Sequence, residues 1–214
     1  MDFDNAQNQA EALFDSIEAV EPVGADLLPG KLFDEIGFNV IASPLLKPLV
    51  LSRIIYPTSK LKITDYWQQY HGIEVKIDEV YRYLDKLHEK EKHRIEQISF
   101  QHTQRIMGSE LLQMVFYDVT TIYFEAEEDD LRKTGFSKDG KTQHPQMVLG
   151  LLVSRGGYPL AYDIFEGNKY EGDTLLPVIN SFKARYGFEQ ITIIADAGLM
   201  SKANIEELEK NKHH

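Results

Sequence analysis

The chain has 214 residues, enough for one or two domains with a sizeable core. Its 43% hydrophobic and 27% charged residues are typical of soluble globular proteins, and the absence of cysteine excludes disulfides, thiolate zinc sites and a cysteine nucleophile. The formal net charge of −11 argues against a general nucleic-acid-binding protein. No apolar run approaches the length of a membrane span, so we expect no membrane association and a reducing, cytoplasmic setting.

The charge is unevenly distributed along the chain. Residues 1–30 hold seven acidic residues and no Lys or Arg, with a short helical pattern around Ala12, Leu13 and Ile17. We expect this segment to be a loosely attached acidic arm. Residues 31–110 hold 12 basic and 11 acidic residues, so this third of the chain repels phosphate least.

Residues 31–110 are predicted to be entirely helical, because apolar residues recur at helical spacing between capping and turn residues. The expected boundaries are Ser43–Pro44 and Pro57 for the first helix, Ser59 and Gly72 for the second, a cap at Asp78 for the third, and Gly108 at the end of the fourth.

The second and third of these helices, from Ser59 to Leu87, have the outline of a helix-turn-helix. In that interpretation phosphates or bases are contacted by Lys76, Tyr81, Arg82 and Lys86. The outline alone leaves open a plain helical hairpin whose aromatic residues form a core. The four histidines of this region lack the spacing of metal ligands: His71, His88, His93 and His102.

Residues 111–214 change to a strand-rich α/β pattern. Strands are predicted at 114–124, 147–153, 158–165 and 191–195, with a tight hairpin at Gly156–Gly157. One helix is expected from Asp173–Thr174 to about Gly187, and a last helix follows a cap at Ser201. The first three strands can form an antiparallel meander, and the crossover helix makes the fourth strand parallel to the first. We therefore expect the first and fourth strands side by side at the centre of the sheet.

Two of these strands each carry one acidic residue. Asp118 lies within 114–124, a stretch so apolar that we expect it to be buried on both faces, and Asp196 follows the β-branched run 191–195. A buried carboxylate must be paired, hydrogen-bonded or bound to a metal. Adjacent strands would bring the two acids into a shared metal site. A hydrogen-bonded core acid at Asp118 and a simple turn residue at Asp196 are the alternatives.

Other charged residues lie in the connections between the strands. The basic residues of the first connection could contact a DNA backbone, or they could belong to a solvent-exposed loop: Arg132, Lys133, Lys138 and Lys141. Glu166 and Glu171 flank a glycine-bearing turn and are weaker candidates for contact with DNA or metal.

Four segments, in this order along the chain, resemble motifs of insertion-sequence DDE transposases: Tyr117–Thr121, Gly135–Lys141, Phe165–Asn168 and Ala195–Gly198. The resemblance is to a branch of that family with a strand-rich insertion between its second Asp and its final Glu. It implies an α/β fold with a partial ribonuclease H-like core, consisting of a three-stranded meander, a helix, a central parallel strand and a helix. The all-helical region would precede this core, giving the divisions 1–30, 31–110 and 111–214.

The resemblance implies metal-dependent DNA strand cleavage and strand transfer at insertion-sequence ends and target DNA. Asp118 and Asp196 would be the first two catalytic acids, holding Mg²⁺ or Mn²⁺, in an enzyme that works as a homodimer. In such sites two cations lie about 3.5–4 Å apart and stabilise the attacking and leaving oxygens. Oxygen ligands suit these ions better than zinc. Thr120 and Thr121 match the motif and are expected to support the strand.

The chain ends one predicted helix after Asp196, whereas the family's Glu lies beyond the insertion. We therefore expect a transposase truncated before its third acid and inactive by itself. A non-catalytic DNA-binding or dimerising remnant is the alternative. Half of an actin-like or sugar-kinase ATPase also begins with a strand bearing Asp, but it needs a glycine directly afterwards, where this chain has Val119. A dehalogenase-like phosphatase needs Asp where Thr120 lies.

Overall fold

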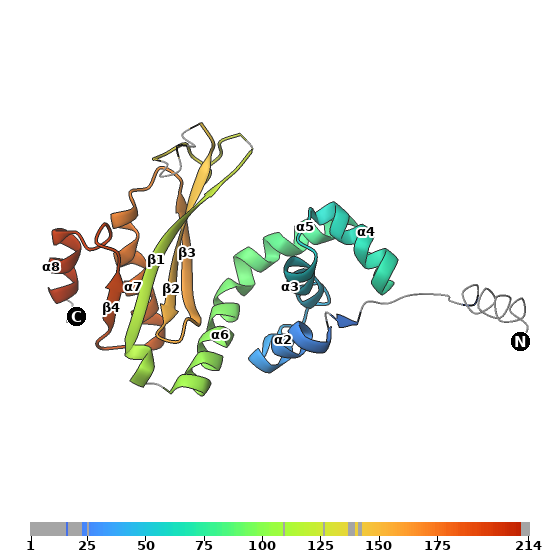
Figure 1. The fold of residues 1–214 in the computed structure, drawn as a ribbon, viewed down its shortest axis with the longest axis horizontal. Helices are drawn as coiled ribbons and strands as arrows, with labels where there is room; N and C mark the ends of the chain where they lie inside the picture. The colour runs from blue at the N-terminus through green and yellow to red at the C-terminus, as the bar shows by residue number, and fades with distance from the viewer. Residues whose placement is uncertain are drawn as a thin grey trace, which may run out of the picture. The chain divides into compact units, whose positions relative to one another are not determined.

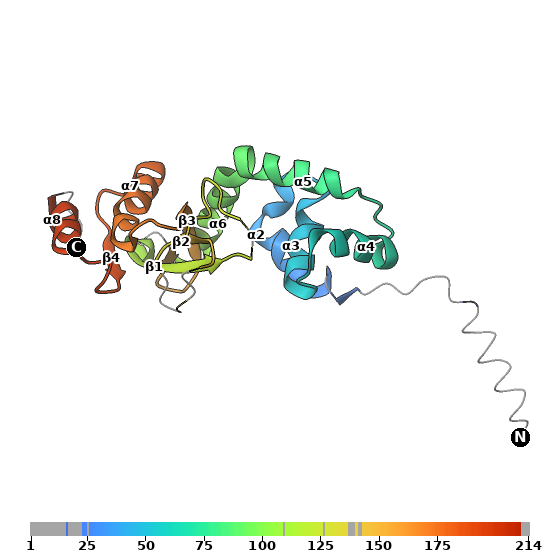
Figure 2. The same ribbon diagram turned by 90° about the horizontal axis from the view of Figure 1, so that it is seen from above.

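The computed structural model describes residues 16, 23, 24, 26–108, 110–125, 127–136, 140 and 143–210. The chain divides into two compact units, the first ending at Ile95 and the second beginning at Glu96 (Figures 1 and 2). The first unit is helical and the second is built on a sheet, so the α/β class with a helical N-terminal region is confirmed. Across the described residues, every helix is too short or too polar to cross a membrane.

The helical unit consists of short helices joined by tight turns. Its elements are the π-helical turn η1 (Asp26–Gly30), α2 (Lys31–Ile36), the 3₁₀ turn η2 (Phe38–Val40), α3 (Leu46–Ile55), α4 (Lys60–His71), α5 (Ile77–Lys86) and the π-helical turn η3 (Leu87–Glu91). The next helix, α6 (Lys92–Met107), begins in this unit and continues into the second. Helix η1 lies within the stretch that we expected to be a loose arm, and it contacts α2 and α3.

The predicted helix boundaries are partly correct. Ser59 Oγ accepts a hydrogen bond from the Lys62 N–H at 3.3 Å, and Gly72 ends α4 in the left-handed conformation (φ 61°), as expected. The caps predicted at Ser43 and Asp78 are wrong. Ser43 Oγ accepts from the Leu45 N–H in a local turn, and α3 begins at Leu46. Lys76 occupies the N-cap position of α5, which places Asp78 in the first turn, where its charge complements the helix dipole.

A small core holds α4 and α5 together. Ile63 and Trp67 of α4 and Val80 of α5 are all at most 2% exposed. The Trp67 indole N–H donates to Ser52 Oγ of α3 at 2.6 Å, so the polar edge of this buried ring is satisfied by the third helix. The aromatic residue Trp67 is therefore a core residue, as the hairpin interpretation requires.

The second unit contains one sheet and the helices that pack against it. Its elements are the 3₁₀ turn η4 (Glu110–Gln113), β1 (Met114–Tyr123), β2 (Gln146–Ser154), β3 (Pro159–Glu166), the 3₁₀ turn η5 (Glu171–Asp173), α7 (Leu175–Tyr186), β4 (Thr192–Ala195) and α8 (Lys202–Lys210). All four strands, the glycine hairpin and the Ser201 cap were predicted. Ser201 Oγ accepts from the Asn204 N–H at 3.2 Å.

The strand order is β3-β2-β1-β4, with β1 antiparallel to β2 and parallel to β4 (Figure 1). The antiparallel meander, the helix and the strand parallel to β1 follow one another in the order that the sequence predicted. The predicted central position of the fourth strand is wrong for the described residues, because β4 is the edge of this sheet. Its parallel neighbour β1 does lie between two strands.

Only one face of the sheet is buried. Alternate residues of β1, including Val115 and Tyr117, belong to the main core together with α7 residues such as Ile179 and Phe182. The opposite face is partly open, with Ile122, Leu151, Ile164 and Ile194 each between 36% and 42% exposed. The expectation that β1 is buried on both faces is therefore wrong. The sequence obscures this, because β-branched and aromatic side chains occur on both faces of the strand.

Helix α7 is fixed to the sheet and to α6 by polar as well as apolar contacts. The Tyr117 hydroxyl donates to Thr174 Oγ1 at 2.8 Å, directly before α7 begins, and the Thr174 hydroxyl donates to the Glu171 carbonyl at 2.6 Å. At the other end of α7, Arg185 donates to the buried Glu96 carboxylate of α6. The rings of Phe100 and Tyr186 stack next to this ion pair, with their centroids 3.7 Å apart.

Candidate metal and DNA site

The register of β1 and β4 brings the two predicted acids to neighbouring positions. The last Cα pair of this parallel ladder is Tyr117 with Ala195. Asp118 and Asp196 are the next residue on each strand, one step beyond that pair. Neighbouring strands lie about 4.8 Å apart, so side chains at adjacent positions on one face are close enough to share a ligand.

Side-chain alternation places both acids on the open face. Tyr117 and Ile193 point into the core shared with α7, so Asp118 and Ile194, which follow them, point to the other side. Continuing the alternation past the core-facing Ala195 places Asp196 on that same side. Both residues are exposed, and the β2 partner of Asp118 is the apolar Leu151. The buried acid that the sequence suggested at Asp118 is therefore a solvent-accessible one.

Neither carboxylate is neutralised by a basic residue within the described part of the chain. Asp118 Oδ1 accepts a hydrogen bond from the adjacent Val119 N–H at 2.8 Å. At Asp196 the backbone carbonyl accepts hydrogen bonds from the N–H groups of Leu199 and Met200, which close the turn after β4. Two like charges on adjacent strands repel each other, and a cation between them would remove that repulsion.

The donor set fits a hard divalent cation. Two carboxylates provide oxygen ligands only, and their exposure leaves room for water and phosphate oxygens to complete the coordination of Mg²⁺ or Mn²⁺. Among the residues that the structure describes, there is no group of three or more His, Cys, Asp or Glu side chains that could hold a metal ion. Any metal held here would therefore take only two protein side chains from the described residues.

The position of Asp118 is set by its buried neighbour Tyr117. The Tyr117 side chain is 2% exposed, and its hydroxyl reaches Thr174 across the space left by Gly150 of β2. A Cβ atom at Gly150 would lie 2.2 Å from the Tyr117 hydroxyl oxygen. Burial raises the pKa of Tyr117 to about 12, the Thr174 hydrogen bond opposes this, and the charges of Asp163 and Asp118 add to it. Sequence analysis missed this arrangement, because no local pattern connects Tyr117 with Thr174.

The basic residues of the β1–β2 connection are less free than expected. Arg132 forms an ion pair with Asp129 at 2.7 Å, and its guanidinium lies 5.8 Å from the Phe124 ring centroid. The Arg132 backbone N–H, followed by its guanidinium, lowers the pKa of Asp129 to about 2. Lys133 forms a backbone bridge with Gln146. Lys138 and Lys141 lie outside the described residues.

The basic residues predicted to bind DNA in the helical unit are exposed. Lys76, Arg82 and Lys86 all reach solvent from the start or the outer face of α5, whose inner face buries Val80 and Tyr83. Arg82 Nε donates to the Asp78 carbonyl at 3.3 Å, one turn earlier in the helix. The structure thus brings Arg82 and Lys86 to one face of α5, while Lys76 lies at its N-terminus.

A cavity lies at the end of the sheet where β1 ends and β2 begins. It has a volume of about 540 Å³ and is lined by Thr121, Gln146 and Gly198 and by the turn Gly167–Glu171. Phe136 and Tyr170 stand at its rim, 82% and 63% exposed. Glu171 lines this cavity, whereas the exposed Glu166 ends β3, two strands away from Asp118.

Comparison with known proteins identifies the sheet unit. Residues 111–214 match the family model described as transposase DDE domain. The comparison with curated proteins gave no match. Among solved structures, the Mos1 transposase paired-end complex with left transposon end is 10% identical, with a TM-score of 0.35, covering 78% of this chain and 56% of that one. The Mos1 mariner paired end complex with Mn is 13% identical, with a TM-score of 0.33 and coverages of 98% and 71%.

The family match agrees with the order of the four motifs and with the strand order of the sheet. It favours the transposase interpretation over an ATPase half or a phosphatase. The chain spans little more than half the length of the first of these Mos1 transposase chains. Over residues 111–214, this protein matches the transposase DDE domain family.

Proposed function

We propose that the open face of the sheet at Asp118 and Asp196 holds Mg²⁺ or Mn²⁺ and that the protein acts in metal-dependent cleavage and transfer of DNA strands. The single observation that carries this proposal is the β1–β4 register, which ends at Tyr117 and Ala195 and leaves the two acids adjacent on one face. The family of residues 111–214 supplies the reaction class.

The chemistry follows from the donor set. When bound, a divalent cation polarises phosphate oxygens and lowers the pKa of bound water, which promotes attack on a phosphodiester. Asp118 and Asp196 would hold the cation and fix its position relative to the DNA. The rigid contact of Tyr117 with Thr174 keeps the backbone of Asp118 in place next to β4. An open, water-accessible face suits a substrate as large as duplex DNA.

Binding of Mn²⁺ tests the metal site directly. We expect titration followed by the electron paramagnetic resonance signal of free Mn²⁺ to reveal a site in the wild-type protein that Asp118→Asn and Asp196→Asn each remove. Asp130→Asn, at an exposed acid of the β1–β2 connection, is the matched control and should bind as the wild type does. Equal Mn²⁺ binding by all four proteins would refute the assignment.

DNA contact by the helical unit is the second part of the proposal. Lys76, Arg82 and Lys86 are exposed on or beside α5 and can neutralise phosphates. Each phosphate contact contributes about 0.9 to the slope of log affinity against log salt on duplex DNA. Replacing all three with Gln should lower that slope by about two to three. An unchanged slope would show that these residues do not contact DNA. A non-catalytic DNA-binding protein would keep this slope but show no metal-dependent nicking of plasmid DNA.

The remaining parts of the proposal concern assembly and setting. Insertion-sequence ends and target DNA would be the partners, and a homodimer would be the working form. The absence of cysteine agrees with a cytoplasmic setting.

A further inference from the structure

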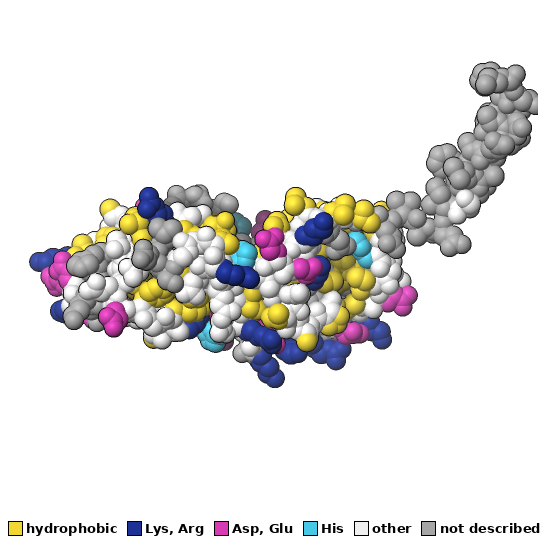
Figure 3. All heavy atoms as spheres, turned by 90° about the horizontal axis from the view of Figure 1, so that it is seen from below, with side chains coloured by type: hydrophobic (Ala, Val, Ile, Leu, Met, Phe, Trp, Pro, Cys, Tyr) yellow, Lys and Arg dark blue, Asp and Glu magenta, His cyan; other side chains and the backbone are white. Residues whose placement is uncertain are grey.

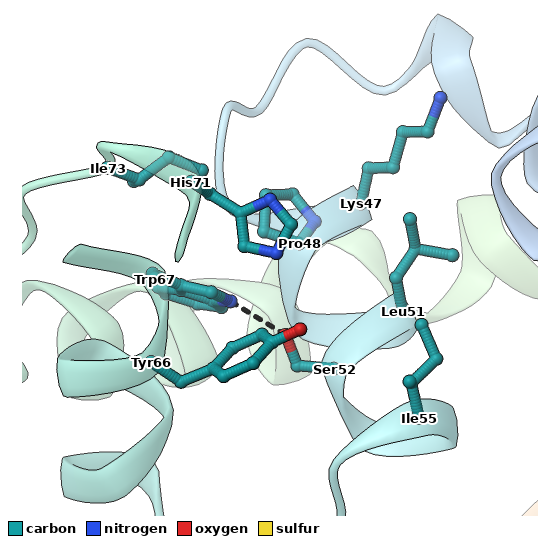
Figure 4. Close-up of a pocket in the computed structure, with 9 residues that line it drawn as sticks. All are labelled: Lys47, Pro48, Leu51, Ser52, Ile55, Tyr66, Trp67, His71 and Ile73. Carbon is teal, nitrogen blue, oxygen red and sulfur yellow. Dashed lines mark hydrogen bonds between the residues drawn. The ribbon is translucent and has the colours of Figure 1, made fainter. Parts of the chain in front are cut away.

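The helical unit has an apolar pocket between α3 and α4 that the DNA chemistry above does not use. Its volume is about 110 Å³, and its walls include Pro48, Leu51, Ile55, Trp67 and Ile73 (Figure 4). Cavities of about 150 Å³ with apolar linings take a benzene ring, so this one has the size of a single apolar side chain. Tyr66 and His71 stand beside it, their rings edge to face at 5.3 Å.

The surface around the pocket is both apolar and basic. Ile54, Ile55, Tyr56 and Leu61 are between 43% and 65% exposed, although each is a large hydrophobic residue. The chain has no acidic residue from Ile36 to Thr64, and this stretch carries Lys47, Arg53, Lys60 and Lys62. Lys47 is paired with Asp34 at 2.8 Å, so Arg53, Lys60 and Lys62 supply the basic charge. On the helical unit, apolar and Lys or Arg side chains reach the same surface (Figure 3). Duplex DNA offers phosphates to the basic residues but no apolar group that would fill the pocket.

The first 22 residues of the chain have the complementary composition. They hold six acidic residues, no Lys or Arg, and the apolar residues Leu13, Phe14 and Ile17. The segment leads into η1, which contacts α3, the helix that forms one wall of the pocket. The roughly ten residues between Phe14 and Asp26 can span about 35 Å when extended. This is more than twice the length of α3, the ten-residue helix along which the pocket lies. The tether is therefore long enough to reach the pocket of the same chain.

We infer that the acidic segment of residues 1–22 binds to its own helical unit, with an apolar side chain from residues 13–17 in the pocket between α3 and α4. The acidic residues of the segment then lie against the basic surface of residues 47–62. Because the tether keeps the segment at high local concentration, weak contacts suffice for binding. Phosphate would compete for the same basic residues, so the segment would oppose DNA binding on this surface.

The single tryptophan of the protein, Trp67, lines the pocket and reports on its occupancy. In the full chain, Leu13→Ser, Phe14→Ser and Ile17→Ser together should shift the emission of Trp67 to the red, because water then replaces an apolar side chain in the pocket beside the buried indole. Asn5→Ser, Gln7→Ser and Gln9→Ser together are the matched control and should leave the emission unchanged. Ile55→Ser on the pocket side should reproduce the effect, with far-UV circular dichroism confirming that the helices remain.

A photo-crosslinker in place of Phe14 identifies the partner surface. We expect cross-links to residues 47–73 in a product of monomer mass, reduced by about 0.5 M NaCl because salt screens the charge contacts. Products of dimer mass would assign the segment to a second copy and overturn binding within the chain. Unchanged Trp67 emission in the apolar variants, or cross-links elsewhere, would overturn the assignment of the pocket. A Trp67 response to duplex DNA that is equal in the wild type and the apolar variants would assign the surface to DNA instead.

Discussion

The Tyr117 hydroxyl of β1 donates a 2.8 Å hydrogen bond to Thr174 Oγ1 at the start of α7. This contact joins residues 57 positions apart and lies directly before Asp118. Replacing Tyr117 with Phe removes the hydroxyl but keeps the ring in the core. We expect a loss of about 1 kcal/mol in the free energy of unfolding, measured by urea denaturation. Thr174→Val should cost a similar amount, and no loss in either variant would show that the contact does not stabilise the protein.

The same tyrosine makes the free energy of unfolding depend on pH in the alkaline range. Its pKa is about 12 in the folded protein and about 10 in the unfolded chain, because burial disfavours the phenolate. Between these values the unfolded chain loses its proton while the folded protein keeps it, so the free energy of unfolding falls as pH rises from 10 to 12. The loss from this residue is on the order of 2 kcal/mol. Tyr117→Phe should show a shallower decline over this window than the wild type. Parallel declines would contradict the assignment.

Gly150 gives a prediction about packing. A Cβ atom there would lie 2.2 Å from the Tyr117 hydroxyl oxygen, closer than any normal contact. Gly150→Ala should therefore lower the free energy of unfolding by about 1–3 kcal/mol. Part of this loss should be recovered in the Tyr117→Phe background, because the nearest atom has gone. A double-mutant cycle measures the coupling, and strict additivity would refute the proposed clash.

The ion pair between Glu96 and Arg185 links α6 to α7. The Glu96 side chain is only 4% exposed, so it depends on its cationic partner. Arg185→Met should lower the free energy of unfolding by about 3 kcal/mol, since a buried carboxylate loses its arginine. Glu96→Met together with Arg185→Met should recover much of this loss. Chemical denaturation of the two variants tests the prediction, and equal stabilities would argue that the carboxylate does not need Arg185.

Much of the sheet unit could be predicted from the sequence. Its strands are runs of β-branched and aromatic residues separated by glycine turns, and the order of strands and helix limits the topology to few choices. Predictions failed where local patterns compete. Ser43 and Asp78 both resemble N-caps, but one closes a turn and the other lies inside a first turn whose cap is Lys76. Asp118 resembles a buried acid because both faces of β1 carry apolar residues, and only the tertiary packing of α7 on one face shows which is covered.

The site itself depends on distant pairs that no local pattern reveals. The fold alone shows the contacts of Tyr117 with Thr174 and Gly150. It also shows that Arg132, which we expected to contact DNA, forms an ion pair with Asp129. Strand order alone predicts that Asp118 and Asp196 lie near each other, and the β1–β4 register, which ends one residue earlier at Tyr117 and Ala195, agrees with that prediction. Their catalytic and metal-binding roles stay predictions, and the exposure of Asp118 changes what its substitution should do. Without metal, Asp118→Asn should change the free energy of unfolding by no more than about 0.5 kcal/mol, because the residue is at the surface.

Thermal melting with and without Mn²⁺ tests the shared site most directly. A ligand bound only by the folded protein at ten times its dissociation constant stabilises it by about 1.4 kcal/mol. We predict that Mn²⁺ raises the melting temperature of the wild type and of Asp130→Asn. Asp118→Asn, Asp196→Asn and the double variant should all lose that increase to the same extent. If the Mn²⁺-dependent increase persists in either single variant, the two aspartates do not form one metal site.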